Sequence, residues 1–157
     1  MLNKVIDRSQ APGLAKENTG RKVVFTNGCF DILHVGHVRY LTNAKALGDL
    51  LVVGLNSDES VRALKGLGRP INSEQDRAEV LAALEVVDHV IVFGEERASA
   101  LIKELRPDIY VKGGDYSLDS LNKEELDVLK SIGARIKLLP IVPGKSTTSL
   151  IRTLQRR

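Results

Sequence analysis

Residues 22–47, KVVFTNGCFDILHVGHVRYLTNAKAL, contain the pattern that decides the fold. Residues 22–26 have the length and apolar character of a strand, and an Asn-Gly turn follows them. Residues 36–47 then place apolar side chains three apart, which indicates one stripe of a helix. That stripe consists of Val38, Leu41, Ala44 and Leu47. A strand followed at once by a helix is the unit that builds parallel sheets with crossover connections.

The same alternation continues to the end of the chain. Further strands are expected at residues 50–55, 87–93, 109–111 and 136–142. Further helices are expected at residues 73–85, 97–105, 122–132 and 146–155. The pattern predicts a doubly wound, Rossmann-like α/β fold, with about five parallel strands and helices on both faces. Ligands of such folds bind beyond the carboxyl ends of the strands, where the winding reverses.

Length and composition favour a single domain that binds a small molecule. A chain of 157 residues with 43% hydrophobic content can bury one continuous core. We expect residues 21–157 to form the domain, and residues 1–20 to be a lead segment, either a short helix at 10–18 or flexible. The net charge is only +3, and three Phe and three Tyr leave little for base stacking. A phosphate-bearing small molecule is therefore favoured over a nucleic acid.

The single cysteine and the absence of long apolar runs exclude other classes. Cys29 alone forms no intrachain disulfide and no cysteine-held metal site, and it reads as a small packed thiol. No stretch approaches the roughly 20 apolar residues that span a bilayer, and the start of the chain lacks the apolar core of a signal peptide. We therefore expect a cytoplasmic protein without a membrane partner.

Two histidines follow the first expected strand. His34 and His37 lie three residues apart at a helix start, so both rings can face the same anion. Free backbone N–H groups and the helix dipole favour negative charge at that position. Gly36 removes a side chain where a phosphate would approach the backbone. Because two of the three histidines of the chain gather here, the pattern predicts a phosphate site rather than ordinary surface histidines.

The run TNGCFDILHVGHVRYL at residues 26–41 resembles the HxGH nucleotidyltransferases, and most closely the adenylyltransferase domain of ADP-heptose synthase. Later stretches resemble further motifs of this family in the same order, so the likeness covers nearly everything from residue 21 onward. These stretches are Asn56-Ser57-Asp58, residues 65–70, residues 75–77, residues 112–116 and Ser146-Thr147-Thr148. The fused sugar kinase domain that often precedes the transferase in this family has no counterpart in the sequence.

The resemblance implies an activity and a set of site residues. The chain would transfer AMP from ATP to a sugar 1-phosphate, D-glycero-β-D-manno-heptose 1-phosphate, and release pyrophosphate. His34 and His37 would stabilise the transition state at the α-phosphorus, and Lys45 would add positive charge. Mg²⁺ would be carried by the triphosphate without a protein ligand, and a homodimer is possible. The implied nucleotide-binding residues are Thr26, Asn27, Gly28, Cys29, Phe30, Gly36, Lys112, Gly113, Asp115, Ser146, Thr147 and Thr148.

The acceptor side is defined less sharply. Basic side chains beside a cleft can clamp an acceptor phosphate, although an exposed basic loop is an equally good interpretation of the same residues. Asp31 could orient the acceptor, orient a ring nitrogen of His34, or cap the helix that follows. The expected acceptor-binding residues are Asp31, Asn56, Asp58, Lys65, Arg69 and Arg77.

Two other function classes remain to be distinguished. A cytidylyltransferase for glycerol 3-phosphate or a related alcohol phosphate shares the histidine motif, and spacing does not separate ATP from CTP. A non-catalytic nucleotide-binding or tRNA-binding module would need a further recognition surface, yet a basic stripe interleaved with aromatic residues is absent. A Rossmann oxidoreductase is disfavoured because no GxGxxG follows the first expected strand.

Overall fold

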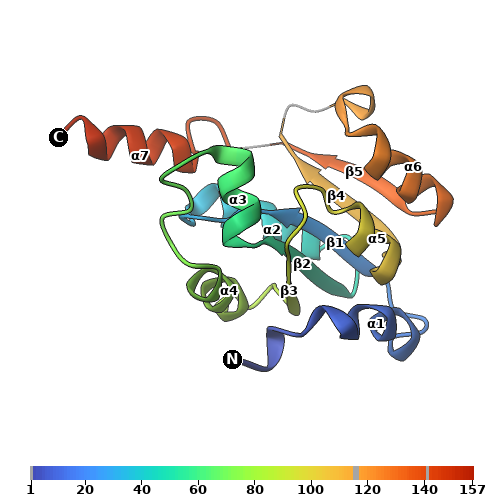
Figure 1. Ribbon diagram of the computed structural model, residues 1–157. Coiled ribbons are helices and arrows are strands. Elements are labelled where there is room, and N and C mark those ends of the chain that lie inside the picture. The colour runs from blue at the N-terminus through green and yellow to red at the C-terminus, as the bar shows by residue number, and fades with distance from the viewer. Residues whose placement is uncertain (1, 115–116, 141) are drawn as a thin grey trace.

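The computed structural model, which describes residues 2–114, 117–140 and 142–157, contains a five-stranded parallel sheet (Figure 1). The strands lie in the order β3-β2-β1-β4-β5. They are β1 (Val23–Gly28), β2 (Leu50–Asn56), β3 (His89–Phe93), β4 (Ile109–Gly113) and β5 (Arg135–Leu139). Each neighbouring pair is parallel. The expected doubly wound α/β fold is confirmed.

Helices connect the strands on both sides of the sheet. They are α1 (Ala11–Glu17), α2 (Val35–Lys45), α3 (Asp58–Lys65), α4 (Glu74–Ala83), α5 (Ser99–Leu105), α6 (Lys123–Ser131) and α7 (Thr147–Gln155). The five helices expected after the first strand are present with small shifts at their ends. Helix α1 corresponds to the helical alternative for the lead segment, and α3 is a helix that the sequence pattern did not predict.

The alternating side chains of β1 show which helices cover each face of the sheet. Successive side chains of a strand point to opposite sides. Val23 and Phe25 of β1 join the core cluster that holds buried residues of α1, α5 and α6. Val24 joins the second cluster, which holds buried residues of α2 and α4. Helices α1, α5 and α6 therefore cover one face of the sheet, and α2 and α4 cover the other.

The winding reverses beside the central strand β1. Strands β2 and β3 extend the sheet on one side of β1, and β4 and β5 extend it on the other. The carboxyl ends of β1 and β4 consequently border a crevice. Figure 1 shows α7 extending away from the sheet, and none of its nine described residues is buried. No helix within the described ranges has the length and apolar character needed to cross a membrane.

Candidate active site

A cavity of about 550 Å³ opens at the carboxyl ends of β1, β2 and β4. It occupies the crevice beside the switch point, where the fold predicts a ligand. The structure brings most of the predicted site residues together around it. Those that line it are Asn27, Gly28, Cys29, Phe30, Asp31, His34, Gly36, His37, Asn56, Lys65, Arg69, Lys112, Gly113, Ser146, Thr147 and Thr148. Asp115, the remaining residue predicted beside Gly113, lies outside the described residues.

Backbone N–H groups orient both imidazole rings. His34 is the N-cap of α2, and its Nδ1 accepts a hydrogen bond from the Gly36 N–H at 3.1 Å. His37 Nδ1 accepts from the His34 N–H at 3.2 Å, and the two ring centroids are 3.9 Å apart. Because Nδ1 is an acceptor in both rings, a neutral imidazole here carries its proton on Nε2. The pair therefore offers two Nε2–H donors at the cavity wall.

Burial keeps the two imidazoles uncharged. It lowers the pKa of His37 to about 4, with a smaller contribution from the neighbouring His34. The pKa of His34 is lowered by burial and then by the charge of Lys145. The ring of Phe30 covers His37, with centroids 5.4 Å apart. At neutral pH the pair can donate hydrogen bonds to a phosphate without bringing positive charge of its own.

Gly36 makes room for the His34 ring. A Cβ atom at residue 36 would lie 2.8 Å from both Nδ1 and Cε1 of His34, a distance that real Cβ contacts do not reach. It would also lie 3.4 Å from Cβ of Lys145. A phosphate was expected to approach the backbone at Gly36, whereas the His34 ring and the Lys145 side chain occupy this space. A glycine is needed here because the ring folds back onto the helix start.

The N-terminus of α7 joins the imidazoles at the same cavity. Ser146 is its N-cap and accepts a hydrogen bond from the Ser149 N–H at 3.0 Å. Thr147 Oγ1 donates to the Ile32 carbonyl at 2.9 Å, which ties α7 to the segment that leads into α2. Thr148 also lines the cavity. Two segments more than a hundred residues apart in sequence thus converge on one space.

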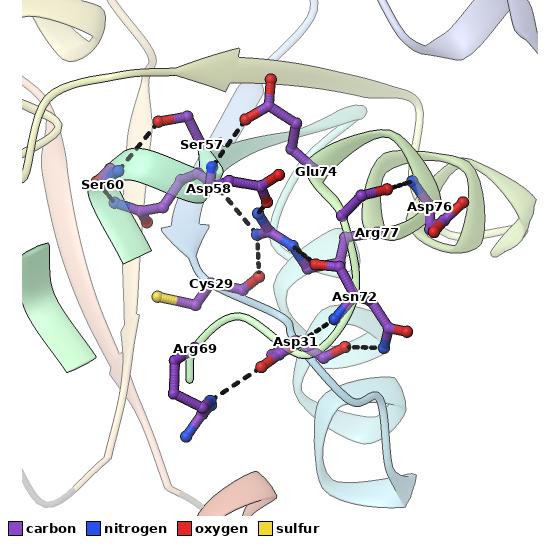
Figure 2. Close-up of polar contacts among 12 residues, drawn as sticks. Cys29, Asp31, Ser57, Asp58, Ser60, Arg69, Asn72, Glu74, Asp76 and Arg77 are labelled. Carbon is purple, nitrogen blue, oxygen red and sulfur yellow. Dashed lines mark hydrogen bonds and ion pairs between the residues drawn. The ribbon is translucent and has the colours of Figure 1, made fainter. Parts of the chain in front are cut away.

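Asp31 fixes the segment 69–72 instead of contacting His34 or capping α2 (Figure 2). Its carboxylate accepts hydrogen bonds from the Arg69 Nε at 2.9 Å, the Ile71 N–H at 2.8 Å and the Asn72 N–H at 3.0 Å. Burial alone would raise the pKa of Asp31, but the N–H groups of Asn72 and Ile71 and the Arg69 guanidinium outweigh it and lower that pKa. Two of the alternatives expected for Asp31, orienting His34 and capping α2, are therefore wrong, and its role in orienting the acceptor stays a prediction.

Arg69 is oriented by this anchor. Only its Nε is bonded to Asp31, and within the described part of the chain its two Nη atoms have no hydrogen-bond partner. The residue lines the cavity together with Lys65. A guanidinium held through Nε leaves its planar Nη edge available for an oxyanion. This geometry fits the acceptor-clamping alternative for Arg69.

Arg77, by contrast, is a buried structural residue, only 2% exposed (Figure 2). Its Nη1 donates to the carbonyls of Cys29 at 2.7 Å and Asn56 at 2.8 Å, and its Nε donates to the Asn72 carbonyl at 3.0 Å. Its Nη2 is paired with Asp58 at 2.8 Å. The acceptor-binding role expected for Arg77 and Asp58 is therefore wrong, because their polar atoms bond each other and the ends of β1 and β2.

Burial raises the pKa of the Cys29 thiol, so this side chain stays protonated at neutral pH.

Thr26 is also removed from the cavity wall. Its side chain is buried within β1, and Oγ1 lies 2.6 Å from the Tyr40 hydroxyl. The Tyr40 hydroxyl also lies 3.1 Å from the Val111 carbonyl, to which it can donate. The expected nucleotide contact of Thr26 is therefore replaced by a link between β1, α2 and β4.

Lys45 lies at the far end of α2 from the imidazoles. An eleven-residue helix is roughly 16 Å long, so its last residue reaches the amino edge of the sheet. There the Lys45 Nζ pairs with Asp88 Oδ2 at 2.6 Å and donates to the Asp49 carbonyl. The structure thus contradicts the expected catalytic role of Lys45. Lys45 and the imidazoles belong to the same helix, but they lie at its opposite ends.

Several cavity residues were not predicted. Tyr40, one turn after His37, packs against Gly113, where an added Cβ would lie 2.8 Å from the Tyr40 ring. Its spacing of three from His37 is a signal that could have identified it. Glu125 also lines the cavity, but the sequence around it indicates only an acidic residue in the first turn of a helix. The other unpredicted lining residues are Leu64, Glu96, Arg97, Val142 and Lys145.

Comparison with curated proteins identifies relatives over most of the chain. The bifunctional protein HldE of Syntrophotalea carbinolica is 55% identical over 138 residues, which cover 88% of this chain and 28% of that protein. The bifunctional protein HldE of Wolinella succinogenes is 51% identical over 156 residues, which cover 97% of this chain and 31% of that protein. The chain therefore spans less than a third of the length of these relatives.

Solved structures and a family model agree with the fold. A lipopolysaccharide core biosynthesis protein from Thermoplasma volcanium is 34% identical, with a TM-score of 0.65 over 78% of this chain and 98% of that one. A pantoate-β-alanine ligase from Francisella tularensis has a TM-score of 0.60 over 98% of this chain and 79% of that one, and at 14% identity it supports the fold alone. The family model described as Cytidylyltransferase-like matches residues 25–154. The chain therefore belongs to the cytidylyltransferase-like family of nucleotidyltransferases.

Proposed function

We propose that the chain transfers AMP from ATP to D-glycero-β-D-manno-heptose 1-phosphate, giving the ADP-sugar and pyrophosphate. The motifs that resemble the adenylyltransferase domain of ADP-heptose synthase support this proposal. Relatives named bifunctional protein HldE and a similar lipopolysaccharide core biosynthesis protein support it as well. The proposed activity is a nucleotidyl transfer, which is the type of reaction that the matched family's name describes.

One observation supports the proposal most strongly: the imidazole pair and the N-terminus of α7 line a single cavity. A triphosphate has three linked anionic groups that need donors at successive positions. His34 and His37 supply Nε2–H donors at one position, and residues 146–148 supply helix N-terminal N–H groups and the Thr148 hydroxyl at another. The arrangement therefore suits a nucleotide whose α-phosphate lies at the imidazoles.

The reaction needs positioning and charge stabilisation rather than a covalent intermediate. An oxygen of the acceptor phosphate attacks the α-phosphorus, the bond from that phosphorus to the bridging oxygen breaks, and pyrophosphate leaves in line. Donors from His34 and His37 to the non-bridging oxygens stabilise the charge that develops there. Neutral imidazoles with fixed Nε2–H groups can do this without a proton transfer.

In this proposal Mg²⁺ enters with the triphosphate. Phosphate oxygens are the hard ligands that Mg²⁺ prefers, and it commonly reaches an active site bound to them. Across the described residues, no group of three or more His, Cys, Asp or Glu side chains could hold a metal ion. Mg²⁺ would partly neutralise the negative charge of the leaving pyrophosphate.

The acceptor phosphate is assigned to the side of the cavity lined by Lys65 and Arg69. Arg69 is held through its Nε by Asp31, so its Nη edge can meet two phosphate oxygens. An acceptor bound there would lie beside the histidine segment, because Asp31 belongs to the same loop between β1 and α2. In this proposal the attacking phosphate lies near the α-phosphorus.

The test is pyrophosphate release from ATP, with Mg²⁺, across a panel of sugar 1-phosphates. We expect release with the heptose 1-phosphate, and a loss of roughly a hundredfold or more in kcat for His37→Ala, because one transition-state donor is removed. Lys45→Gln is the matched control, and its kcat should stay within about twofold of the unmodified protein. Nucleotide binding without turnover for any acceptor would instead indicate a non-catalytic nucleotide-binding module.

The second candidate is a cytidylyltransferase for glycerol 3-phosphate or a related alcohol phosphate. The family model, described as Cytidylyltransferase-like, is the observation that favours it. A thermal-shift comparison of ATP with CTP in the presence of Mg²⁺ separates the two, because the nucleotide bound more tightly raises the melting temperature more. Stronger stabilisation by CTP would overturn the assignment to ATP.

A further inference from the structure

The cavity has two chemically different walls. Helix α2 and the N-terminus of α7 contribute imidazoles, hydroxyls and Lys145. The second wall comes from the segment before α5 and the first turn of α6, and it contributes Glu96, Arg97 and Glu125. The donors of the first wall attract phosphate groups, whereas the Glu125 carboxylate repels them. A ligand with its phosphates on the donor wall would therefore present its uncharged part to the carboxylates.

Glu125 is the more constrained of the two carboxylates. It lies in the first turn of α6 and is 4% exposed, although it lines the cavity. One carboxylate oxygen, Oε1, accepts the Ala98 N–H at 3.0 Å, at the start of α5. This single bond ties α6 to α5 and fixes the orientation of the carboxylate.

The second oxygen of Glu125 remains available. Among the described residues, Glu125 makes no other side-chain hydrogen bond. Within that same part of the chain, the fully buried side-chain atoms without a partner are His89 Nδ1 and Ser99 Oγ, so Glu125 Oε2 keeps some exposure, and the residue that carries it lines the cavity. A carboxylate this buried is costly unless its oxygens gain hydrogen bonds, and a ligand can supply the missing donor.

We propose that Glu125 recognises sugar hydroxyls in this cavity and so selects a polyhydroxylated substrate. Carboxylate oxygens accept hydrogen bonds from hydroxyl groups and exclude phosphate by repulsion. The donor comes either from the acceptor sugar or from the ribose of the nucleotide, and both sources have the same chemistry. The inference rests on the proposed nucleotidyl transfer, and it adds a residue that the histidine motif does not indicate.

Glu125→Gln is the sharpest test because it preserves shape. The amide oxygen can keep the bond from the Ala98 N–H, while the cavity-facing acceptor becomes an NH₂ donor. We expect the KM of one hydroxyl-bearing substrate to rise roughly tenfold, the effect of losing one hydrogen bond to a charged group. Glu124→Gln, at an exposed position on the same turn, is the matched control and should leave both KM values unchanged.

The two hydroxyl sources give different results. If the acceptor sugar is the donor, the acceptor KM rises in Glu125→Gln, the ATP KM stays constant, and 2′-deoxy-ATP and 3′-deoxy-ATP serve as well as ATP. If the ribose is the donor, the ATP KM rises, and discrimination against one deoxy nucleotide disappears in the variant. Glu125→Asp keeps the charge but shortens its reach, so it should raise the same KM.

A purely structural role would overturn the inference. In that case both KM values of Glu125→Gln would stay within about twofold of the unmodified protein, or would change only together with its melting temperature. If the unmodified protein turns over no sugar 1-phosphate, the proposed function fails first. The role of Glu125 is then judged by calorimetry with ATP, the two deoxy nucleotides and the heptose 1-phosphate, and equal affinities for variant and unmodified protein would reject it.

Discussion

At the scale of single residues, the two imidazoles owe their protonation state to backbone N–H groups and to burial. The Gly36 N–H donates to Nδ1 of His34, and the His34 N–H donates to Nδ1 of His37, so the Nε2–H groups are the donors of both rings. No carboxylate among the described residues contacts either ring, and nothing favours the charged form. This differs from a general-base histidine, which needs a pKa near the working pH. The pair is built to donate hydrogen bonds.

The lowered pKa of His37 predicts a pH dependence of stability. Its folded-state pKa of about 4 lies below the ordinary value of 6.5, so the unfolded chain binds a proton between these values that the folded chain does not. Stability is therefore unaffected by His37 above pH 6.5 and falls as the pH drops toward 4. Because the ring is only partly buried, we expect an effect of about 1 kcal/mol, or roughly 2–4 °C in melting temperature.

Melting temperatures of the unmodified protein and His37→Gln, measured from pH 4 to 7.5, check this. The uncharged amide of the variant does not titrate, so its melting temperature should fall less on acidification. Identical pH profiles for the two proteins would show that His37 titrates alike in the folded and unfolded chains.

Motif order predicted most cavity residues, but not the environment of each charged side chain. His34, His37 and residues 146–148 were placed correctly because strand ends and helix starts meet at one edge of a parallel sheet. Arg77 and Arg69 look alike in sequence, yet one is buried among carbonyls and the other borders the cavity. Burial of an arginine depends on segments distant in sequence, which no local pattern contains.

At the scale of elements, each predicted strand or helix carries a clear pattern of apolar residues: a short apolar run for a strand, or a stripe along one side for a helix. Helix α3 was missed because it buries only Ser60 and Val61, too few residues to give a helical stripe. Strand β1 extends two residues beyond its expected end, because Asn27 and Gly28 pair with Gly54 and Leu55 of β2. Sheet pairing, rather than apolar character, sets that boundary.

The contrast between Arg77 on α4 and Arg69 in the preceding loop gives a prediction at this scale. Arg77→Met leaves three carbonyls and the Asp58 carboxylate without their partner, and should lower the free energy of unfolding by about 3 kcal/mol. Arg69→Met removes the ion pair with the buried Asp31 carboxylate, which keeps its bonds from the Ile71 and Asn72 N–H groups, and should cost less, about 1–2 kcal/mol. It should instead raise the acceptor KM roughly tenfold with little change in the ATP KM.

Urea unfolding and steady-state kinetics on the two variants measure both effects. Arg62→Met, at an exposed position on α3, is the control for replacing an arginine as such. A large loss of stability in Arg69→Met together with an unchanged acceptor KM would reverse the assigned roles.

At the scale of the whole molecule, the core begins before the region matched by the family model. The match to the family begins at residue 25, whereas Ala11 and Leu14 of α1 are buried in the same hydrophobic cluster as Phe25. The segment 11–17 therefore contributes to the fold as a packed helix. The division at residue 20 and the possible homodimer stay predictions, and the packing of α1 shows only that the core extends across that division.

In the proposed reaction, one cavity between the two halves of the sheet joins the α-phosphate of ATP to a sugar phosphate. The direct measurement follows ATP labelled in its α-phosphate, incubated with Mg²⁺ and D-glycero-β-D-manno-heptose 1-phosphate, and identifies the labelled product by mass spectrometry. We expect the label to appear in an ADP-sugar, together with one pyrophosphate for each molecule formed. Label that remains in ATP, or is released as free AMP without a sugar nucleotide, would contradict it.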